Sequence, residues 1–299
     1  MKTLVENKKG HGAIYHPVVR SLTKLLRRKR SKLAMATAPY DWSTPFDIRT
    51  TIGQIAIKDQ GTSFSCSGQA ASYFLEIQRR RKLINEGAIS AKSIYAPIAF
   101  PGGGTTVSEL EAQIASHGAN LELTVPSYDA YGAPLSELMI TDMSWETSAL
   151  KTDALIRSGY TPFDLTIDID IIAENIKTWG ACILEVRGQN GHTPTWLSST
   201  PSAPVPDNGN EIWHHFLVAI GSTMLGGKKA IIVLNSWGTT VGENGEQYVT
   251  EDFFTGKGVV DAFTFIPNTE ISPAPTNMSL WAMILRWWRA LRGLPAVVQ

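Results

Sequence analysis

The chain has 299 residues, of which 43% are hydrophobic and 18% charged, a composition typical of a globular protein and not of a disordered one. This length suffices for one large domain or two intimate ones with a substantial core. No run of 18 apolar residues occurs, so a membrane-spanning helix is not expected. No apolar segment of signal-peptide length precedes residue 40, which favours a cytoplasmic location and leaves non-classical export open.

The net charge of zero hides an uneven distribution. Residues 1–33 hold ten Lys and Arg against one acidic residue, and residues 275–299 hold three Arg and no acid. The remaining 14 basic and 26 acidic residues lie between them, which gives residues 34–274 a net charge of −12. Two basic ends on an acidic body are expected either to fold back onto it or to bind an anionic partner.

The first 37 residues are interpreted as a basic N-terminal tail or short pro-segment. Apolar residues at spacings of three and four between Val18 and Leu26, followed by the basic run 27–30, predict a short amphipathic helix. A solvated tail is the alternative interpretation.

Three helices are predicted between residues 65 and 180. The first spans about 65–86, with four basic residues in its last turns that complement the helix dipole. The second begins at Ser108, where 108–111 has the pattern of a capping box, and stops at Gly118. The third spans about 170–179 and ends at Gly180.

Strands are expected mainly in the second half, which makes the fold class α+β with two lobes. A Pro-rich linker over 267–276 and a basic amphipathic helix over 277–299 should follow the main domain, residues 38–266. That last helix is expected to dock on the protein's own body or to meet a membrane surface or partner. The predicted strands span residues 181–187, 213–220, 230–234, 247–249 and 259–265.

The segment 58–70 combines a cysteine with a helix start. Cys66 opens the first predicted helix, where unpaired backbone N–H groups and the helix dipole favour its thiolate. Gln60 lies six residues earlier across a loop that contains Gly61. Its side-chain amide is placed to donate to an oxyanion that develops beside the backbone N–H of Cys66.

A histidine and an asparagine follow in two later strands. His215 precedes an apolar run, and Asn235 ends another such run before Ser236 and Trp237. An amide oxygen can orient a basic imidazole without adding charge, and Trp237 would shelter that contact from water. His214 is the rival for the role of base, because successive strand residues face opposite sides and only one can face the cysteine.

These blocks resemble the papain-like cysteine peptidases over about residues 38–266. The matching segments occur in the family's order, and His215 lies 149 residues after Cys66, near the separation typical of the family. Counting back six residues from Gly221 selects His215, as in the family. The matching segments are Gln60-Gly61, Cys66, His215 with its apolar strand and Gly221, Asn235-Ser236-Trp237-Gly238-Thr239, and Gly242-Glu243-Asn244-Gly245.

The resemblance implies a cleft between a helical and a strand-rich lobe, with a Cys66–His215 thiolate–imidazolium pair. Asn235 would orient His215, and Gln60 would line the oxyanion hole. The segment 101–105 resembles the family's glycine-rich substrate strip, whose backbone holds an extended peptide. The implied substrate-binding residues are Gly103, Gly104, Trp237 and His214, the last near the pocket that selects substrate side chains.

The sequence also departs from the family pattern. Ser63 stands where a disulfide-bonded cysteine is usual, Ser67 replaces the tryptophan that follows the nucleophile, and Val241 replaces the second tryptophan of the asparagine block. The only other cysteine, Cys182, lies in an apolar strand and is expected to pack in the core. A disulfide would consume the nucleophile, so a disulfide-free, atypical branch is expected.

The function expected from the sequence is hydrolysis of peptide bonds in a protein or peptide substrate through a Cys66 thioester. No cofactor, metal or nucleic acid is expected, although the thiol must stay reduced. Two alternatives stay open. The same thioester would serve an acyltransferase, or an inactive peptidase fold would bind an anionic membrane surface or partner protein through its basic tails.

Overall fold

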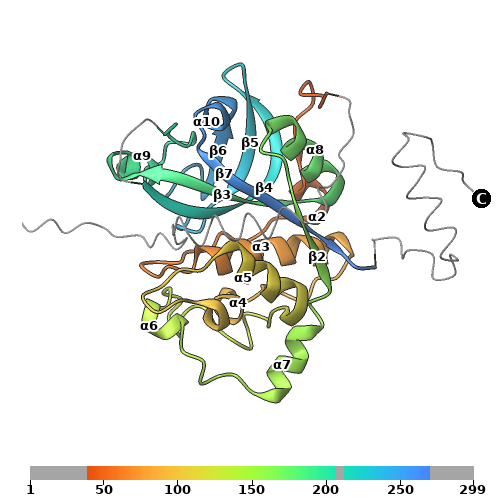
Figure 1. Cartoon of the computed structure of the whole chain (residues 1–299), viewed down its shortest axis with the longest axis vertical. Helices are drawn as coiled ribbons and strands as arrows, with labels where there is room; N and C mark the ends of the chain where they lie inside the picture. Colours follow the sequence, from red (N-terminus) through yellow and green to blue (C-terminus); the bar gives the residue numbers. More distant parts are fainter. Residues whose placement is uncertain (1–38, 207–211, 270–299) are drawn as a thin grey trace, which may run out of the picture.

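The computed structural model describes residues 39–206 and 212–269, which form a helical lobe and a strand-rich lobe (Figure 1). This α+β architecture agrees with the fold class expected from the sequence. Within the described part of the chain, no helix is long and apolar enough to cross a membrane. The predicted basic tail 1–37, the C-terminal helix 277–299 and the linker beyond residue 269 lie outside the described residues and stay predictions.

Short helices lie beside one long helix, α3, in the first lobe, whereas α2 lies on the sheet side of α3, where its Arg49 contacts Glu246 on the sheet (Figure 1). The other short helices pack mainly on one another and on the side of α3 that faces away from the sheet (Figure 1). The elements are α2 Arg49–Ile52, α3 Cys66–Arg81, α4 Ala91–Tyr95, η1 Ala96–Ile98, α5 Val107–Ala112, η2 Gln113–His117, α6 Glu137–Ile140 and α7 Ser148–Leu155.

Helix α3 is the central helix of the molecule. Every residue from Cys66 to Gln78 is buried, because one side packs on the sheet and the other on α4. The helix ends at Arg81, earlier than the predicted residue 86, because Leu83 adopts the left-handed conformation with φ 60°. The amide of Ile84 then turns back to the carbonyl of Arg79, which closes the helix end.

The predicted start of the second helix at Ser108 is wrong. Helix α5 has Thr106 as its N-cap, and a capping box joins Thr106 to Glu109. Both hydroxyl residues have a glutamate three positions later, but Glu111, the partner expected for Ser108, is fully buried within the lobe. The helix continues as a π-helical turn, η2, and stops at Gly118 as expected.

A seven-stranded antiparallel sheet forms the second lobe. Its strands are ordered β2-β7-β3-β4-β5-β6, and β1 pairs separately with β4. Five of the strands overlap those predicted from the sequence. The strands are β1 Phe46–Asp47, β2 Tyr160–Asp164, β3 Cys182–Gln189, β4 Ile212–Leu225, β5 Lys228–Leu234, β6 Glu246–Thr250 and β7 Val259–Pro267.

Strands β1 and β2 were not predicted. Strand β2 contains Pro162, which interrupts a strand pattern in the sequence but is tolerated here because β2 lies at the sheet edge. Its partner β7 extends to Pro267, and the amide of Asn268 still donates to the carbonyl of Gly159. The sheet therefore continues into the first residues of the predicted linker.

The two faces of the sheet enter different cores. On β4, Phe216 and Val218 belong to a core shared with α3, whereas Leu217 and Ala219 belong to a second core on the other face. Helix α8 packs on that second face, with Asp168 as its N-cap and Gly180 as its C-cap. The remaining elements of this lobe are α8 Ile169–Trp179, η3 Asn190–His192, α9 Thr193–Trp196 and α10 Glu251–Thr255.

Candidate active site

Cys66 is the first residue of α3, the helix that packs against β4. Its side chain is fully buried in the core between the two lobes. The preceding loop is fixed by short polar contacts, since the Ser63 hydroxyl lies 2.7 Å from the Gln60 carbonyl and 2.7 Å from the Ser65 hydroxyl. The nucleophile predicted from the sequence therefore stands at a helix N-terminus, where the dipole favours a thiolate.

His215 and Asn235 are in direct contact. Nε2 of His215 lies 2.9 Å from Oδ1 of Asn235, and both side chains are fully buried. The indole of Trp237 stacks on the imidazole with ring centroids 4.2 Å apart and planes 24° apart. Trp237 thus lies face to face with His215, and its sheltering of the His215–Asn235 contact stays a prediction.

Directed hydrogen bonds fix the tautomer of His215. The backbone N–H of Ser236 donates to Oδ1 of Asn235 at 2.7 Å, so that atom is an acceptor. Nε2 of His215 therefore carries the hydrogen, and Nδ1 is the nitrogen that can take up a proton in the neutral ring. The pair has the arrangement that a general base requires.

Gln247 orients Asn235 and was missed in the sequence. The Nδ2 group of Asn235 donates to Oε1 of Gln247 at 2.6 Å, and Nε2 of Gln247 donates to the Trp196 carbonyl at 3.1 Å. The side chain of Gln247 is fully buried. A glutamine inside a short predicted strand is the only local sign of this role, because Trp196 lies 51 residues away.

Two backbone hydrogen bonds join the loop before α3 to the segment after β5. The amide of Gln60 donates to the Ser236 carbonyl at 2.8 Å, and the amide of Gly238 donates to the Lys58 carbonyl at 3.1 Å. The Ser236 hydroxyl also donates to Oε1 of Gln60 at 2.6 Å. These contacts bring Gln60 beside the His215–Asn235 pair and bind one lobe to the other.

Tyr73 ties α3 to both of these segments. Its hydroxyl accepts the backbone N–H of Lys58 at 2.5 Å and donates to the Asn235 carbonyl at 3.2 Å. Burial raises the pKa of Tyr73 well above its usual value, which keeps the donor protonated. Tyr73 lies two turns after Cys66, so the helix that carries the cysteine is linked to the segment that carries Asn235.

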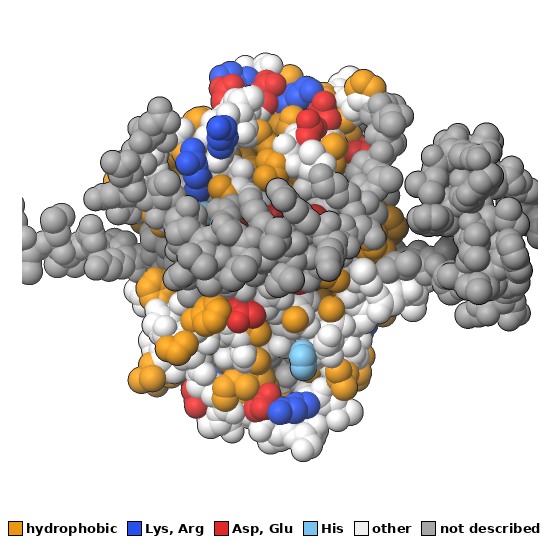
Figure 2. Space-filling view, in the orientation of Figure 1, with side chains coloured by type: hydrophobic (Ala, Val, Ile, Leu, Met, Phe, Trp, Pro, Cys, Tyr) orange, Lys and Arg blue, Asp and Glu red, His pale blue; other side chains and the backbone are white. Residues whose placement is uncertain are grey.

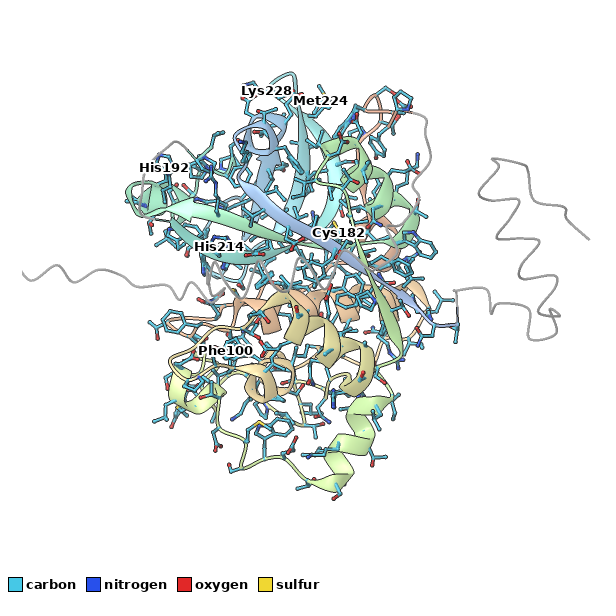
Figure 3. The ribbon with its side chains drawn as sticks, viewed as in Figure 1. Phe100, Cys182, His192, His214, Met224 and Lys228 are labelled. Atoms are coloured by element: carbon cyan, nitrogen blue, oxygen red, sulfur yellow. The ribbon has the colours of Figure 1, made fainter. Side chains whose placement is uncertain are left out.

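His214 lies on the opposite side of β4 from His215. Its Nδ1 is 2.6 Å from Oε1 of Glu185 on β3, and both side chains are buried. His214, which Figure 3 labels, and His215 are successive residues of β4, so their side chains leave the strand on opposite sides. The two adjacent histidines thus have different partners, and only His215 contacts Asn235.

The glycine-rich segment forms a tight turn in the helical lobe. The amide of Gly103 donates to the Phe100 carbonyl at 2.9 Å, and the Gly104 carbonyl accepts from the Phe100 amide at 3.0 Å. The amide of Gly104 donates to the Tyr95 hydroxyl at 2.6 Å. Gly104 is buried and both of its backbone groups are bonded internally, whereas Gly103 is partly exposed.

Three other features of the described residues were candidates for a second site: Cys182, clusters of metal-binding side chains, and a cavity. Cys182 is fully buried in β3, where burial raises its pKa, in keeping with the packing role expected for it (Figure 3). The described residues contain no group of three or more side chains suited to hold a metal ion. A cavity of about 510 Å³ lies in the helical lobe between α5 and α7, and none of the predicted site residues lines it.

The surface of the helical lobe carries apolar side chains. Tyr131 and Leu138 are 96% and 83% exposed, and both lie in the segment that ends with α6. Figure 2 shows hydrophobic side chains scattered over the visible face of this lobe, among acidic and basic groups.

Comparison with known proteins identifies the fold. No family model and no curated protein matches the sequence. Among solved structures, xylellain, a cysteine protease from Xylella fastidiosa, superposes with a TM-score of 0.66 at 15% identity, over 89% of this chain and 99% of its own. Digestive procathepsin L2 from Tenebrio molitor gives 0.66 at 18% identity, over 89% and 80%. Procathepsin B S9 from Trypanosoma congolense gives 0.61 at 14% identity, over 89% of each chain.

These likenesses extend over nearly all of the described residues and include both lobes. At 14–18% identity they establish architecture and not activity. The resemblance seen in the sequence is therefore upheld at the level of the fold: the chain has the two-lobed fold of the papain-like cysteine proteases.

Proposed function

We propose that this protein is a cysteine peptidase with Cys66 as nucleophile, His215 as general acid and base, and Asn235 as the residue that orients His215. The observation that carries the proposal is the junction of the two lobes. Two backbone hydrogen bonds join the loop that leads to Cys66 with residues 236–238, and the neighbouring Asn235 contacts the imidazole of His215. A fold alone would not require this combination of side chains.

Catalysis would begin with transfer of the Cys66 thiol proton to Nδ1 of His215. The thiolate then attacks the peptide carbonyl carbon, and the resulting oxyanion accepts hydrogen bonds from the Cys66 backbone N–H and the Gln60 amide. The Gln60 Nε2 donates one hydrogen to the Ser63 carbonyl at 2.7 Å, and a primary amide has a second hydrogen for this role.

Collapse of the tetrahedral intermediate breaks the C–N bond, and the His215 imidazolium protonates the leaving amine. A water molecule, deprotonated by His215, then attacks the thioester carbon and releases the carboxylic acid and the Cys66 thiol. The neutral amide of Asn235 holds His215 in one orientation through both protonation states, while Trp237 keeps water away from their contact.

The substrate would be an extended peptide that lies between the lobes. Gly103 is proposed to contact its backbone, and His214, with its partner Glu185, to contact a substrate side chain from the sheet side. Trp237 borders the same region through its stacking on His215.

The test is labelling of the reduced protein with an epoxysuccinyl peptide, located by peptide mass spectrometry. We expect modification at Cys66 and none at Cys182, which is an internal control because it is equally buried but lacks an activating base. His215→Ala should slow the modification by about 100-fold or more, since general base catalysis contributes about 10² to 10⁴.

Slow labelling of both cysteines, unaffected by His215→Ala, would refute the peptidase. In that case the alternative of an inactive peptidase fold that acts through its basic tails would gain support.

Product analysis with an added amine separates hydrolysis from acyl transfer, because a transferase forms the amide adduct in preference to the free acid.

A further inference from the structure

The carboxylate of Glu137, the first residue of α6, accepts two hydrogen bonds from different parts of the helical lobe. The backbone N–H of Phe64 donates to Oε2 at 2.6 Å, and the Tyr95 hydroxyl lies 2.7 Å from Oε1. Phe64 is two residues before Cys66, so Glu137 holds the loop that presents the nucleophile.

Tyr95 extends this contact to the glycine-rich turn. Its hydroxyl accepts the backbone N–H of Gly104 at 2.6 Å. The ring is fully buried and packs with Leu135 and Ile140, which flank Glu137 in the sequence. Tyr95 also lies directly against the first turns of α3, since a Cβ at Gly68 would be 2.8 Å from the Cβ of Tyr95.

The donor and the acceptor of each hydrogen bond in this network can be assigned. A backbone N–H can only donate, so the Tyr95 hydroxyl accepts from Gly104 and gives its own hydrogen to Glu137. Burial and the contact with Glu137 raise the pKa of Tyr95 well above its usual value, which keeps that hydrogen in place. Both oxygens of Glu137 therefore act as acceptors, one for each donor.

Packing brings the two loops into direct contact at the same place. A Cβ at Gly103 would lie 2.3 Å from Cδ2 of Phe64 and 3.0 Å from Oε1 of Glu137, and φ of Gly103 is +95°. Only glycine fits this conformation and this space. The nucleophile loop and the glycine-rich turn thus touch one another, and one carboxylate is bonded to the first directly and to the second through Tyr95.

We propose that Glu137 and Tyr95 are positioning residues that set the spacing between the Cys66 loop and the glycine-rich turn, the two borders of the peptide site in the helical lobe. This inference rests on the proposed peptidase function. It assigns a role to two residues outside the catalytic group. It also predicts that different mutations can disturb the glycine-rich turn and the Cys66 loop separately.

Tyr95→Phe removes the hydroxyl and leaves the Gly104 N–H without its partner, while the bond from Phe64 to Glu137 remains. It should slow inactivation by an epoxysuccinyl peptide, which needs the aligned turn, by about tenfold or more, since a 1 Å misplacement can cost about 100-fold. Alkylation of Cys66 by iodoacetamide, which needs no peptide contacts, should stay within about twofold of the unaltered protein.

Glu137→Gln keeps the size of the side chain but leaves it one acceptor oxygen for two donors. Because it disturbs the Phe64 end as well, it should slow both reagents. Matched controls in the same lobe are Tyr131→Phe, at an almost fully exposed tyrosine, and Glu146→Gln, at a glutamate whose partner is Lys151. Neither control should alter the reaction with either reagent.

Rates for Tyr95→Phe and Glu137→Gln within twofold of the unaltered protein would overturn the positioning role alone. Equal slowing of both reagents in Tyr95→Phe would also overturn it, since that pattern indicates general damage to the lobe. If Tyr95→Phe does not fold, Glu137→Gln decides, because its side chain is partly exposed: slower reaction with both reagents than in Glu146→Gln supports the role, and rates equal to those of Glu146→Gln overturn it. Absence of any Cys66 reactivity in the unaltered protein would overturn the peptidase proposal and this one with it.

Discussion

At the scale of single residues, hydrogen-bond direction determines what each polar side chain of the site can do. The Trp196 carbonyl can only accept, so it fixes the amide of Gln247, which fixes Asn235, which in turn fixes the tautomer of His215. All of these side chains are fully buried, so water cannot replace a missing partner. The orientation of His215 is thus determined by a residue two contacts away from it.

Gln247→Leu should therefore lower kcat and stability together. It leaves Nδ2 of Asn235 buried without an acceptor, which costs about 1–3 kcal/mol, and it frees Asn235 to rotate away from His215. The measurements are steady-state kinetics and urea unfolding. Gln113→Leu is the control, since Gln113 is also buried and bonds a carbonyl, but in the helical lobe. Equal loss of kcat in both variants would contradict the role of Gln247.

At the scale of elements, the site is built where α3 meets the segments beside β4 and β5. The loop before α3 pairs with residues 236–238, and Tyr73 on α3 bonds to Lys58 in that loop and to Asn235, the residue just before 236. Helix α3 also approaches α4 closely, since a Cβ at Gly68 would be 2.6 Å from the Ala91 carbonyl oxygen. The helix that carries Cys66 is thus fixed on both sides.

Tyr73→Phe should test the link between α3 and the sheet lobe. The ring packing is retained, but the Lys58 N–H loses its acceptor, which should lower the free energy of unfolding by about 1–3 kcal/mol. We expect a reduced kcat with little change in KM, because the two lobes are bonded less tightly but the glycine-rich turn is untouched. A change confined to KM would argue against this link.

At the scale of the whole molecule, charged groups are buried beneath the junction of the lobes. Lys58 and Glu76 form an ion pair at 2.7 Å, and Glu122 lies close enough for both charges to affect it. Burial raises the pKa of Glu122 above its ordinary value of 4.5, and the donors on Ser127 and the charge of Lys58 only partly offset that effect.

Because of Glu122, the free energy of unfolding of the protein should decrease as the pH rises. Below pH 4.5 Glu122 is protonated in both states; above it the unfolded chain loses the proton first, so the free energy of unfolding decreases until the folded pKa is passed. Glu122→Gln cannot ionise, so its stability relative to the unaltered protein should increase as the pH rises from below 4.5 through the raised pKa of Glu122. Thermal unfolding of both proteins over this range provides the check. A constant difference would contradict the raised pKa.

The sequence by itself determined the candidate residues and the class of fold. Cys66 at a helix start, His215 in an apolar strand and Asn235 after another strand could be found because helix and strand periodicity are local properties. Strand β2 and the start of α5 were missed, because Pro162 at a sheet edge and the choice between two hydroxyl N-caps depend on neighbours distant in the sequence.

Only the tertiary structure decided which residues support that site. Glu137 meets Phe64 across 73 residues and Tyr95 across 42, Gln247 meets Trp196 across 51, and Glu185 meets His214 across 29. A glutamate, a tyrosine or a glutamine has no local pattern that reveals such a partner, because its hydrogen bonds form only after the lobes have packed. Local sequence patterns therefore indicate the chemistry of the candidate residues, whereas contacts that exist only in the folded molecule fix their orientation.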